Sequence, residues 1–231
     1  MACTPWSAIL PPVNELEMLL DKYEQLHVYA DDAHNSSWQG DRGEGLILNR
    51  MGHHSRVTVA LSLNKSFATA GGLVALPDDT IRQRIRSLGE TLTFSGPIQP
   101  PMLGGICASA DIHLSAELFS LQNKLRNKIN CFNALCAEKG LNLVDHSVSP
   151  IRFIQVGATK RAIELARQLI GRGFFTCTAG FPSVAKNKAG IRVTITNHQT
   201  EEDMQALTNA IAELAQVNTE GSLEDSEIEM A

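Results

Sequence analysis

The sequence has no excess of basic residues and no long apolar run. Its 231 residues include 20 Lys or Arg and 25 Asp or Glu, a formal net charge of −5. Because nucleic-acid-binding proteins present a basic surface to phosphates, we expect no nucleic-acid partner. No apolar stretch approaches the roughly 20 residues of a membrane-spanning helix, so we expect no membrane partner. The first residues carry no basic segment followed by an apolar stretch, so we expect no secretory signal and a cytoplasmic protein.

Cysteine pairs at metal-binding or redox spacing are also absent. The sequence has five cysteines, an odd number, and none forms a Cys-x-x-Cys pair. In a reducing cytosol such residues are typical of small buried thiols rather than of a disulfide framework. We therefore expect unpaired, buried thiols at Cys3, Cys107, Cys131, Cys136 and Cys177.

Helices and strands are predicted to alternate in the first part of the chain. The apolar spacing predicts a helix over 13–25 and another from Pro77-Asp78-Asp79 to about Leu88. Strands are predicted over 26–31, 57–63 and 73–76, the second being a near-continuous apolar run that suits a buried parallel strand. This alternation predicts an α/β fold with a parallel sheet. A doubly wound cofactor-binding sheet usually contains more than about three strands, so the sheet looks incomplete.

The second part of the chain predicts a long helix and then a smaller α+β unit. The helical stretch runs from about Met102 to Lys139 with a break, and Gly140 is a plausible residue just past its end. Strands are predicted over 151–156, 174–178 and 191–196, and helices over 159–172 and 201–214. From Val217 the sequence has five acids and no Lys, Arg or aromatic residue, which predicts disorder. We therefore expect domains at 1–140 and 141–216, with an acidic tail over 217–231.

Three features in the first part carry candidate chemistry. Asp31 ends a predicted strand, and His34 follows three residues later. Lys65 lies just past the end of another buried strand, and a small, flexible Ala70-Gly71-Gly72 follows it. Ligands of open α/β sheets bind beyond the carboxyl ends of strands, where Asp31 and Lys65 both project. Taken singly, each residue is typical of a turn or a solvated surface. Asp31 and His34 also suit a metal pair, but no third ligand stands at a sensible spacing.

The order and spacing of these motifs resemble a known family. Asp31-Asp32-Ala33-His34, followed by Gly40-Asp41-Arg42-Gly43, is similar to the corresponding region of the α-oxoamine synthases. These form a branch of the fold-type I pyridoxal-phosphate enzymes, within the aminotransferase class I/II family. Ser62-Leu63-Asn64-Lys65 resembles their Ser/Thr-x-x-Lys motif, and the resemblance covers about residues 5–215. It implies part of a PLP-transferase large domain, followed by a small α+β C-terminal domain.

The resemblance implies a role for each motif residue around pyridoxal 5'-phosphate. Lys65 would form the Schiff base and then accept and donate a proton. Asp31 would pair with the pyridine nitrogen and keep it protonated, so that the ring accepts electrons. His34 would contact the phenolic oxygen of the cofactor or the incoming acyl group.

Three further residues take binding roles by the same resemblance. Ser62 would hold the cofactor phosphate through its hydroxyl, and Ser95 would contact the phosphate of a neighbouring subunit. Arg192 would bind the carboxylate of the amino-acid substrate, a planar two-point contact that suits a guanidinium.

The implied reaction condenses an amino acid with an acyl-CoA or other acyl thioester and releases carbon dioxide. An aminotransferase remains an alternative, because it shares Asp31 and Lys65. The family's chains also have a longer N-terminal part, with a phosphate-binding turn and a ring-stacking residue that this sequence does not show. Three non-catalytic readings therefore stay open: a fragment, half of a split enzyme that needs an N-terminal partner, or a pseudoenzyme subunit that stabilises a complex. For a catalytic protein, the family resemblance implies a homodimer. A plain α/β binding domain without this chemistry is the third class.

Overall fold

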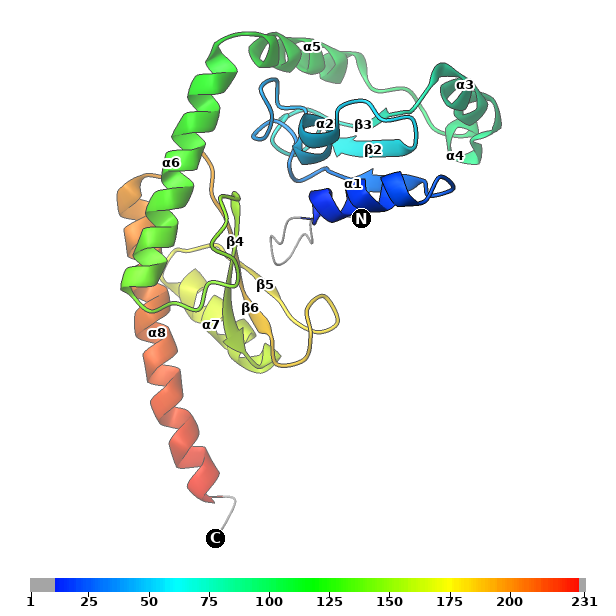
Figure 1. Cartoon of the computed structure of the whole chain (residues 1–231). Helices are drawn as coiled ribbons and strands as arrows, with labels where there is room; N and C mark the ends of the chain where they lie inside the picture. The colour runs from blue at the N-terminus through cyan, green and yellow to red at the C-terminus, as the bar shows by residue number, and fades with distance from the viewer. Residues whose placement is uncertain (1–10, 229–231) are drawn as a thin grey trace. The chain divides into compact units, whose positions relative to one another are not determined.

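The computed structural model describes the backbone of residues 11–228 and the side chains of residues 11–215 (Figure 1). The chain divides into two compact units, of which one extends to Gln122 and the other begins at Asn123. This division falls inside helix α6 (Glu117–Glu138), whereas the sequence places the first domain boundary at residue 140. The domain bounds stay a prediction. The prediction for Cys3 lies outside the described residues.

The first unit contains a three-stranded sheet in the order β1 (Val28–Asp31), β2 (Val57–Ser62) and β3 (Gly72–Ala75). β1 and β2 are parallel, as predicted, and Asp31 lies opposite Ala60. β3 is antiparallel to β2, so the expectation of parallel strands is wrong for this strand. The segment between β2 and β3 spans only residues 63–71, and parallel strands need a crossover of a dozen or more residues.

Two helices cover one face of this sheet. Helix α1 (Val13–Lys22) and helix α2 (Leu46–Met51) pack in one apolar cluster with β1 and β2 (Figure 1). The α1 residues that share this face recur at helical spacing, and Leu20 is only 1% exposed. The buried members of the cluster are Val13, Leu16, Leu20, Ala30, Leu46, Ile47, Val57 and Val59.

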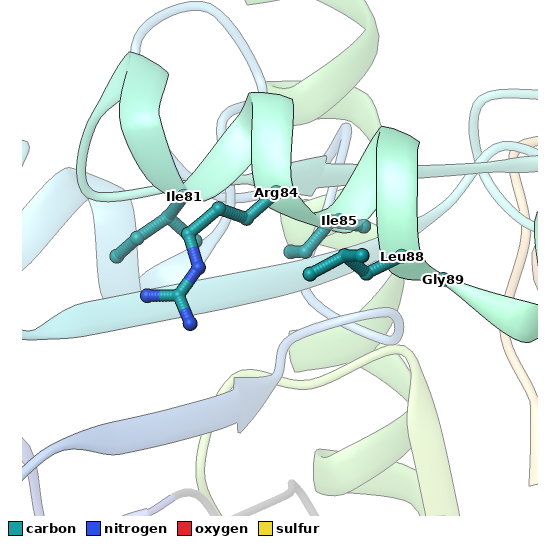
Figure 2. A pocket seen from close by; sticks show the side chains of 5 residues that line it. All are labelled: Ile81, Arg84, Ile85, Leu88 and Gly89. Carbon is teal, nitrogen blue, oxygen red and sulfur yellow. The ribbon is translucent and has the colours of Figure 1, made fainter.

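Three further helices follow β3 in the chain: α3 (Asp79–Leu88), α4 (Glu90–Thr93) and α5 (Pro100–Leu114). Asp78 caps α3, because its Oδ1 accepts a hydrogen bond of 2.8 Å from the Ile81 amide. The predicted break in the long helix lies between Leu114 and Glu117. α3 contains no buried residue, although its apolar side chains gather on one side. They line a groove with Arg84 and Gly89 (Figure 2), and the apolar members are Ile81, Ile85 and Leu88.

The second unit is an α+β unit with an antiparallel sheet. Its strand order is β4 (Ile151–Gly157), β6 (Ala189–Thr194) and β5 (Cys177–Ala179). Helices α7 (Thr159–Gly171), α8 (Glu201–Ile228) and the later part of α6 contribute to its core. The most deeply buried side chains of this core, including Ile129, Phe132, Leu169, Ile191 and Ile211, are inaccessible to solvent. The small α+β unit is therefore confirmed as a fold.

The N-terminus of α8 is fixed by a reciprocal cap. The Asp203 amide donates to Thr200 Oγ1 over 3.1 Å, and the Thr200 amide donates to Asp203 Oδ2 over 2.8 Å. The helix start predicted from Thr200 is therefore confirmed. The assigned helix continues to Ile228 and includes most of the acidic segment from Val217. Disorder of that segment stays a prediction.

The described cysteines are unpaired but not uniformly buried. Burial raises the pKa of the Cys136 thiol to about 12, so that thiol stays protonated. Cys107 and Cys177 are exposed, which corrects the expectation of buried thiols. Cys107 lies on α5, which has no buried residue, and Cys177 lies on β5 at the edge of its sheet. Within residues 11–228, no helix has the length and apolar character needed to cross a membrane.

The packing of α1 predicts a contrast between adjacent leucines. Leu20→Ala leaves a cavity beneath the first sheet, and we expect it to lower the free energy of unfolding by about 2–5 kcal/mol. Leu19, which is 45% exposed, is the matched control, and Leu19→Ala should cost well under half as much. Urea unfolding monitored by circular dichroism measures both values. Equal losses would show that α1 does not pack through this face.

Candidate functional site

Asp31 and Asp32 are adjacent but have opposite environments. Asp31 is exposed at the end of β1, and its Oδ1 accepts a hydrogen bond of 3.1 Å from the Ala33 amide. Asp32 is only 1% exposed, and it accepts hydrogen bonds from Asn35 Nδ2 over 2.8 Å and from the Ile47 amide over 2.9 Å. Burial raises the pKa of the Asp32 carboxyl above its ordinary value, and these hydrogen bonds oppose that rise. Asp31 therefore faces solvent, while Asp32 stabilises the local structure through its contacts with Asn35 and Ile47.

The role of Asp32 is the main residue assignment that the sequence analysis missed. Its carboxylate binds the first turn of α2 from 15 residues earlier in the chain, and so fixes the intervening segment that contains His34. A detectable signal was Gly45, which precedes α2 and has a φ of +91°. A Cβ at Gly45 would lie 2.5 Å from Asp32 Oδ2, so this close approach requires glycine.

Lys65 lies in a closed turn between β2 and β3. The Leu63 amide donates to Gly71 O over 3.0 Å, and the Thr69 amide donates to Leu63 O over 2.8 Å. The Ala68 amide donates to the carbonyl of Lys65 itself over 2.9 Å. These bonds close the turn, so the exposed Lys65 side chain is carried on a defined support.

The structure brings Lys65 and His34 into contact. Lys65 Nζ lies 3.1 Å from His34 Nε2, although 31 residues separate them in the chain. The lysine nitrogen can donate to an imidazole nitrogen that carries no proton, so the two groups suit a hydrogen bond. Since β1 and β2 are parallel, the ends of both strands lie at one edge of the sheet, and Asp31 is at that edge too. The predicted grouping of Asp31, His34 and Lys65 is thus supported by the topology of the first unit.

The remaining predicted site residues are placed as follows. Ser62 ends β2 at the same edge, and its hydroxyl donates to Asn64 Oδ1. Ser95 follows α4 and donates to the carbonyl of Thr91. Arg192 lies in β6 of the second unit, where it pairs across the sheet with Phe153 and Cys177. The structure thus brings Ser62 to the edge that carries Lys65, while the roles of all three stay predictions.

The metal alternative finds no support within the described residues. No group of three or more His, Cys, Asp or Glu side chains gathers there in an arrangement suited to a metal ion. The contact that His34 makes at Nε2 is with an amine, which is a hydrogen-bond donor rather than a fellow ligand.

Comparison with known proteins identifies the family. A family model described as aminotransferase class I and II matches residues 7–211, which is most of the chain. The chain belongs to the aminotransferase class I and II family. The family predicted from the Asp31, His34 and Lys65 motifs is thereby confirmed.

Two curated relatives show which named proteins the chain resembles. The chain is 30% identical over 207 residues to 8-amino-7-oxononanoate synthase 1 of Bacillus subtilis (strain 168), covering 89% of this chain and 51% of that protein. It is 26% identical over 208 residues to 8-amino-7-oxononanoate synthase of Alkaliphilus metalliredigens (strain QYMF), covering 90% and 51% respectively. The chain therefore spans about half the length of the curated relatives that it matches.

Solved structures confirm the fold. Sphingomonas wittichii serine palmitoyltransferase matches 91% of this chain and 52% of its own, with a TM-score of 0.81 at 16% identity. The 8-amino-7-oxononanoate synthase from Francisella tularensis matches 94% and 62%, with a TM-score of 0.75 at 22% identity. The predicted class, part of a PLP-transferase α/β domain followed by a small α+β domain, is therefore correct.

The contrast between the two acids gives a testable pair of variants. Asp32→Asn cannot accept both hydrogen bonds as the carboxylate does, and its amide brings donors toward the α2 amides. We expect it to lower the free energy of unfolding by about 1–3 kcal/mol. Asp31→Asn, at an exposed position, should change that value by less than about 0.5 kcal/mol. Equal effects in urea unfolding would contradict the buried role of Asp32.

Proposed function

We propose that this chain carries the lysine-bearing part of a pyridoxal-phosphate-dependent transferase, with Lys65 as the cofactor lysine. The observation that carries the proposal is the 3.1 Å contact between Lys65 Nζ and His34 Nε2, at the strand edge where Asp31 ends β1. The family and the relatives' names support it, since cofactors of open α/β sheets bind at such edges.

The donor set at this edge fits the cofactor. Pyridoxal phosphate supplies a ring that accepts electrons from a carbon centre next to the substrate amine. The exposed Asp31 carboxylate is suited to hold a protonated pyridine nitrogen, and the Ser62 hydroxyl is suited to hold a phosphate oxygen. Lys65 presents an exposed primary amine on a closed turn, which is the group required for covalent attachment.

His34 gives Lys65 a partner for proton handling. Its Nε2 accepts from the Lys65 amine, which holds Nζ at one position and leaves its other hydrogens directed elsewhere. In that position the Lys65 amine takes a proton from the substrate carbon and returns it after bond formation. Arg192 would hold the carboxylate of the amino acid by two parallel hydrogen bonds.

The reaction we propose for the whole protein is the condensation of an amino acid with an acyl-CoA and the loss of carbon dioxide. The relatives' names support this α-oxoamine synthase chemistry, because curated proteins similar to the chain include 8-amino-7-oxononanoate synthases and matched structures include serine palmitoyltransferases. An aminotransferase is the second candidate, favoured by the description of the matching family model. Turnover with an acyl-CoA, but not with a 2-oxo acid, separates the first activity from the second. A cytoplasmic location fits either reaction.

The surface of the first unit supports association with a second polypeptide. Leu73 and Val74 on the edge strand β3 are 47% and 49% exposed, and α3 presents an apolar groove (Figure 2). An uncovered strand edge beside apolar side chains favours pairing with another chain. We therefore propose a homodimer, or a complex with a partner that supplies an N-terminal part. If the chain has no activity either as a homodimer or in such a complex, a non-catalytic fragment is the alternative.

Association predicts a mass in solution above that of one chain. Size-exclusion chromatography with light scattering should give at least about twice the 25.1 kDa of one chain at micromolar concentration. Leu73→Lys, which places charge on the β3 edge, should shift the mass toward one chain, whereas Leu19→Lys on α1 should not. A well-behaved monomer in every case would contradict self-association.

Cofactor attachment is tested by an absorbance titration with pyridoxal phosphate. We expect a band at the blue edge of the visible that requires Lys65 and shifts when glycine, alanine or serine is added. Lys65→Ala should lose the band, while Lys124→Ala, at an exposed position on α6, should keep it. A band of equal strength in Lys65→Ala would contradict the assignment of Lys65, and no band in any variant would favour the non-catalytic fragment.

A further inference from the structure

Among the described residues of the first unit, two buried polar side-chain atoms have no hydrogen-bond partner: Ser37 Oγ and His113 Nε2. Ser37 lies in the segment between His34 and α2, is 7% exposed and has a φ of +72°. His113 lies near the end of α5. Buried polar atoms are nearly always paired, so two unpaired atoms in one region call for a physical account.

Both residues contact the same glycine. A Cβ at Gly43 would lie 2.8 Å from His113 Cδ2 and 2.8 Å from Ser37 Cα. Cδ2 is bonded to Nε2 in the imidazole ring, so the unpaired nitrogen belongs to the ring edge that faces Gly43. Gly43 has a φ of +71°, and its carbonyl accepts from the Ser37 amide over 2.8 Å. His113 Cδ2 and Ser37 Cα therefore both lie close to Gly43.

Their hydrogen-bonding capacities are complementary. His113 Nδ1 lies 2.7 Å from the carbonyl oxygen of Ser109, which only accepts, so Nδ1 carries the proton. In the neutral ring Nε2 then has a lone pair and acts as an acceptor. The Ser37 hydroxyl has a proton to donate. His113 Nε2 thus lacks a donor, and the Ser37 hydroxyl lacks an acceptor.

His113 is also joined to the turn that carries Lys65. Its ring packs on Phe67, with centroids 4.6 Å apart and planes 30° from parallel. Ser109, one helical turn before His113, donates from Oγ to the Phe67 carbonyl over 2.8 Å. Phe67 lies within the turn that the Ala68 to Lys65 backbone bond closes. Helix α5 therefore contacts the lysine turn and the Gly43 region through neighbouring side chains.

We propose that Ser37 Oγ is linked to His113 Nε2 through one bridging water molecule, and that this link positions the Lys65 turn against the segment that carries His34. Ser37 and His113 are positioning residues, since neither touches the reacting groups. The link itself depends only on the geometry of the first unit. Its consequence for Lys65 rests on the proposed function.

A double-mutant cycle tests the link. Ser37→Ala removes the donor, and His113→Phe removes the acceptor while keeping a ring on Phe67. We expect the two effects on the unfolding equilibrium constant to be non-additive, with a coupling factor of about 2 or more. Ser36→Ala is the matched control, because Ser36 is equally buried but its hydroxyl lies 3.4 Å from the Ala33 carbonyl. Ser36→Ala should be additive with His113→Phe, and additivity for Ser37→Ala would overturn the link.

A second acceptor variant keeps the test decisive if His113→Phe folds poorly. His113→Gln retains an oxygen that reaches the position of Nε2 but loses the aromatic contact with Phe67. It should stay coupled to Ser37→Ala, because a donor and an acceptor are still present. Loss of coupling with Gln, together with additivity for Phe, would show that His113 acts on the turn by packing alone.

Positioning of Lys65 needs a separate measurement. The full chain is treated with pyridoxal phosphate and borohydride, and mass spectrometry compares the labelling rates of Lys65 and Lys124 in each variant. We expect Ser37→Ala and His113→Phe each to lower the Lys65 to Lys124 ratio by about 10-fold, with Ser36→Ala unchanged. Coupled stability with an unchanged ratio would overturn the positioning role. Absence of Lys65 labelling in the unsubstituted chain would contradict the proposed function, and the unfolding cycle would still decide the link.

Discussion

The parallel pairing of β1 with β2 brings residues that are distant in the sequence to one edge of a sheet. Asp31 pairs with Ala60, so the residues that follow each strand emerge side by side. An antiparallel arrangement would send the ends of the two strands to opposite edges and would separate Asp31 from Lys65. The contact of Lys65 Nζ with His34 Nε2 is the direct consequence of this pairing. Every role proposed for these residues requires it.

The segments that leave this edge are held by polar contacts rather than by regular structure. Asp32 binds the start of α2 and so closes the segment after β1. Internal backbone bonds close the turn after β2. Ser109 and His113 on α5 contact that turn through Phe67, while His113 also contacts Gly43. Irregular segments keep a defined shape only when their backbone groups are paired, and these side chains supply part of that pairing.

Sequence reasoning predicted the parts of the fold that depend on local spacing. The start of α8 at Thr200 and the strand that ends at Asp31 follow from a capping residue and from apolar periodicity, whereas the position of the break after Leu114 was not predicted. The direction of β3 was predicted wrongly, because an apolar run has no direction and only the length of its connection reveals it. The short helix α2 was missed, since six residues give too little periodicity to separate a helix from a loop.

In the candidate site too, sequence reasoning found what depends on order in the chain and missed what depends on tertiary packing. Asp31, His34 and Lys65 were found from their order in the chain, and the topology explains why that order matters. Asp32 was overlooked because the sequence gives both acids the same appearance, whereas burial separates them. The contact of His113 with Phe67 and Gly43 depends on how α5 folds back on the unit, so no spacing in the sequence reveals it. The roles of Ser62, Ser95 and Arg192 stay predictions.

The central claim is that Lys65 is the amine that the fold presents to the cofactor. Peptide mapping after borohydride reduction of the chain with one equivalent of pyridoxal phosphate tests it most directly, since it reports which lysine carries the pyridoxyl group. The account predicts that the label lies on the peptide containing Lys65 and disappears in the presence of an excess of substrate amine. A label spread over several surface lysines in proportion to their exposure, and unaffected by that amine, would contradict it.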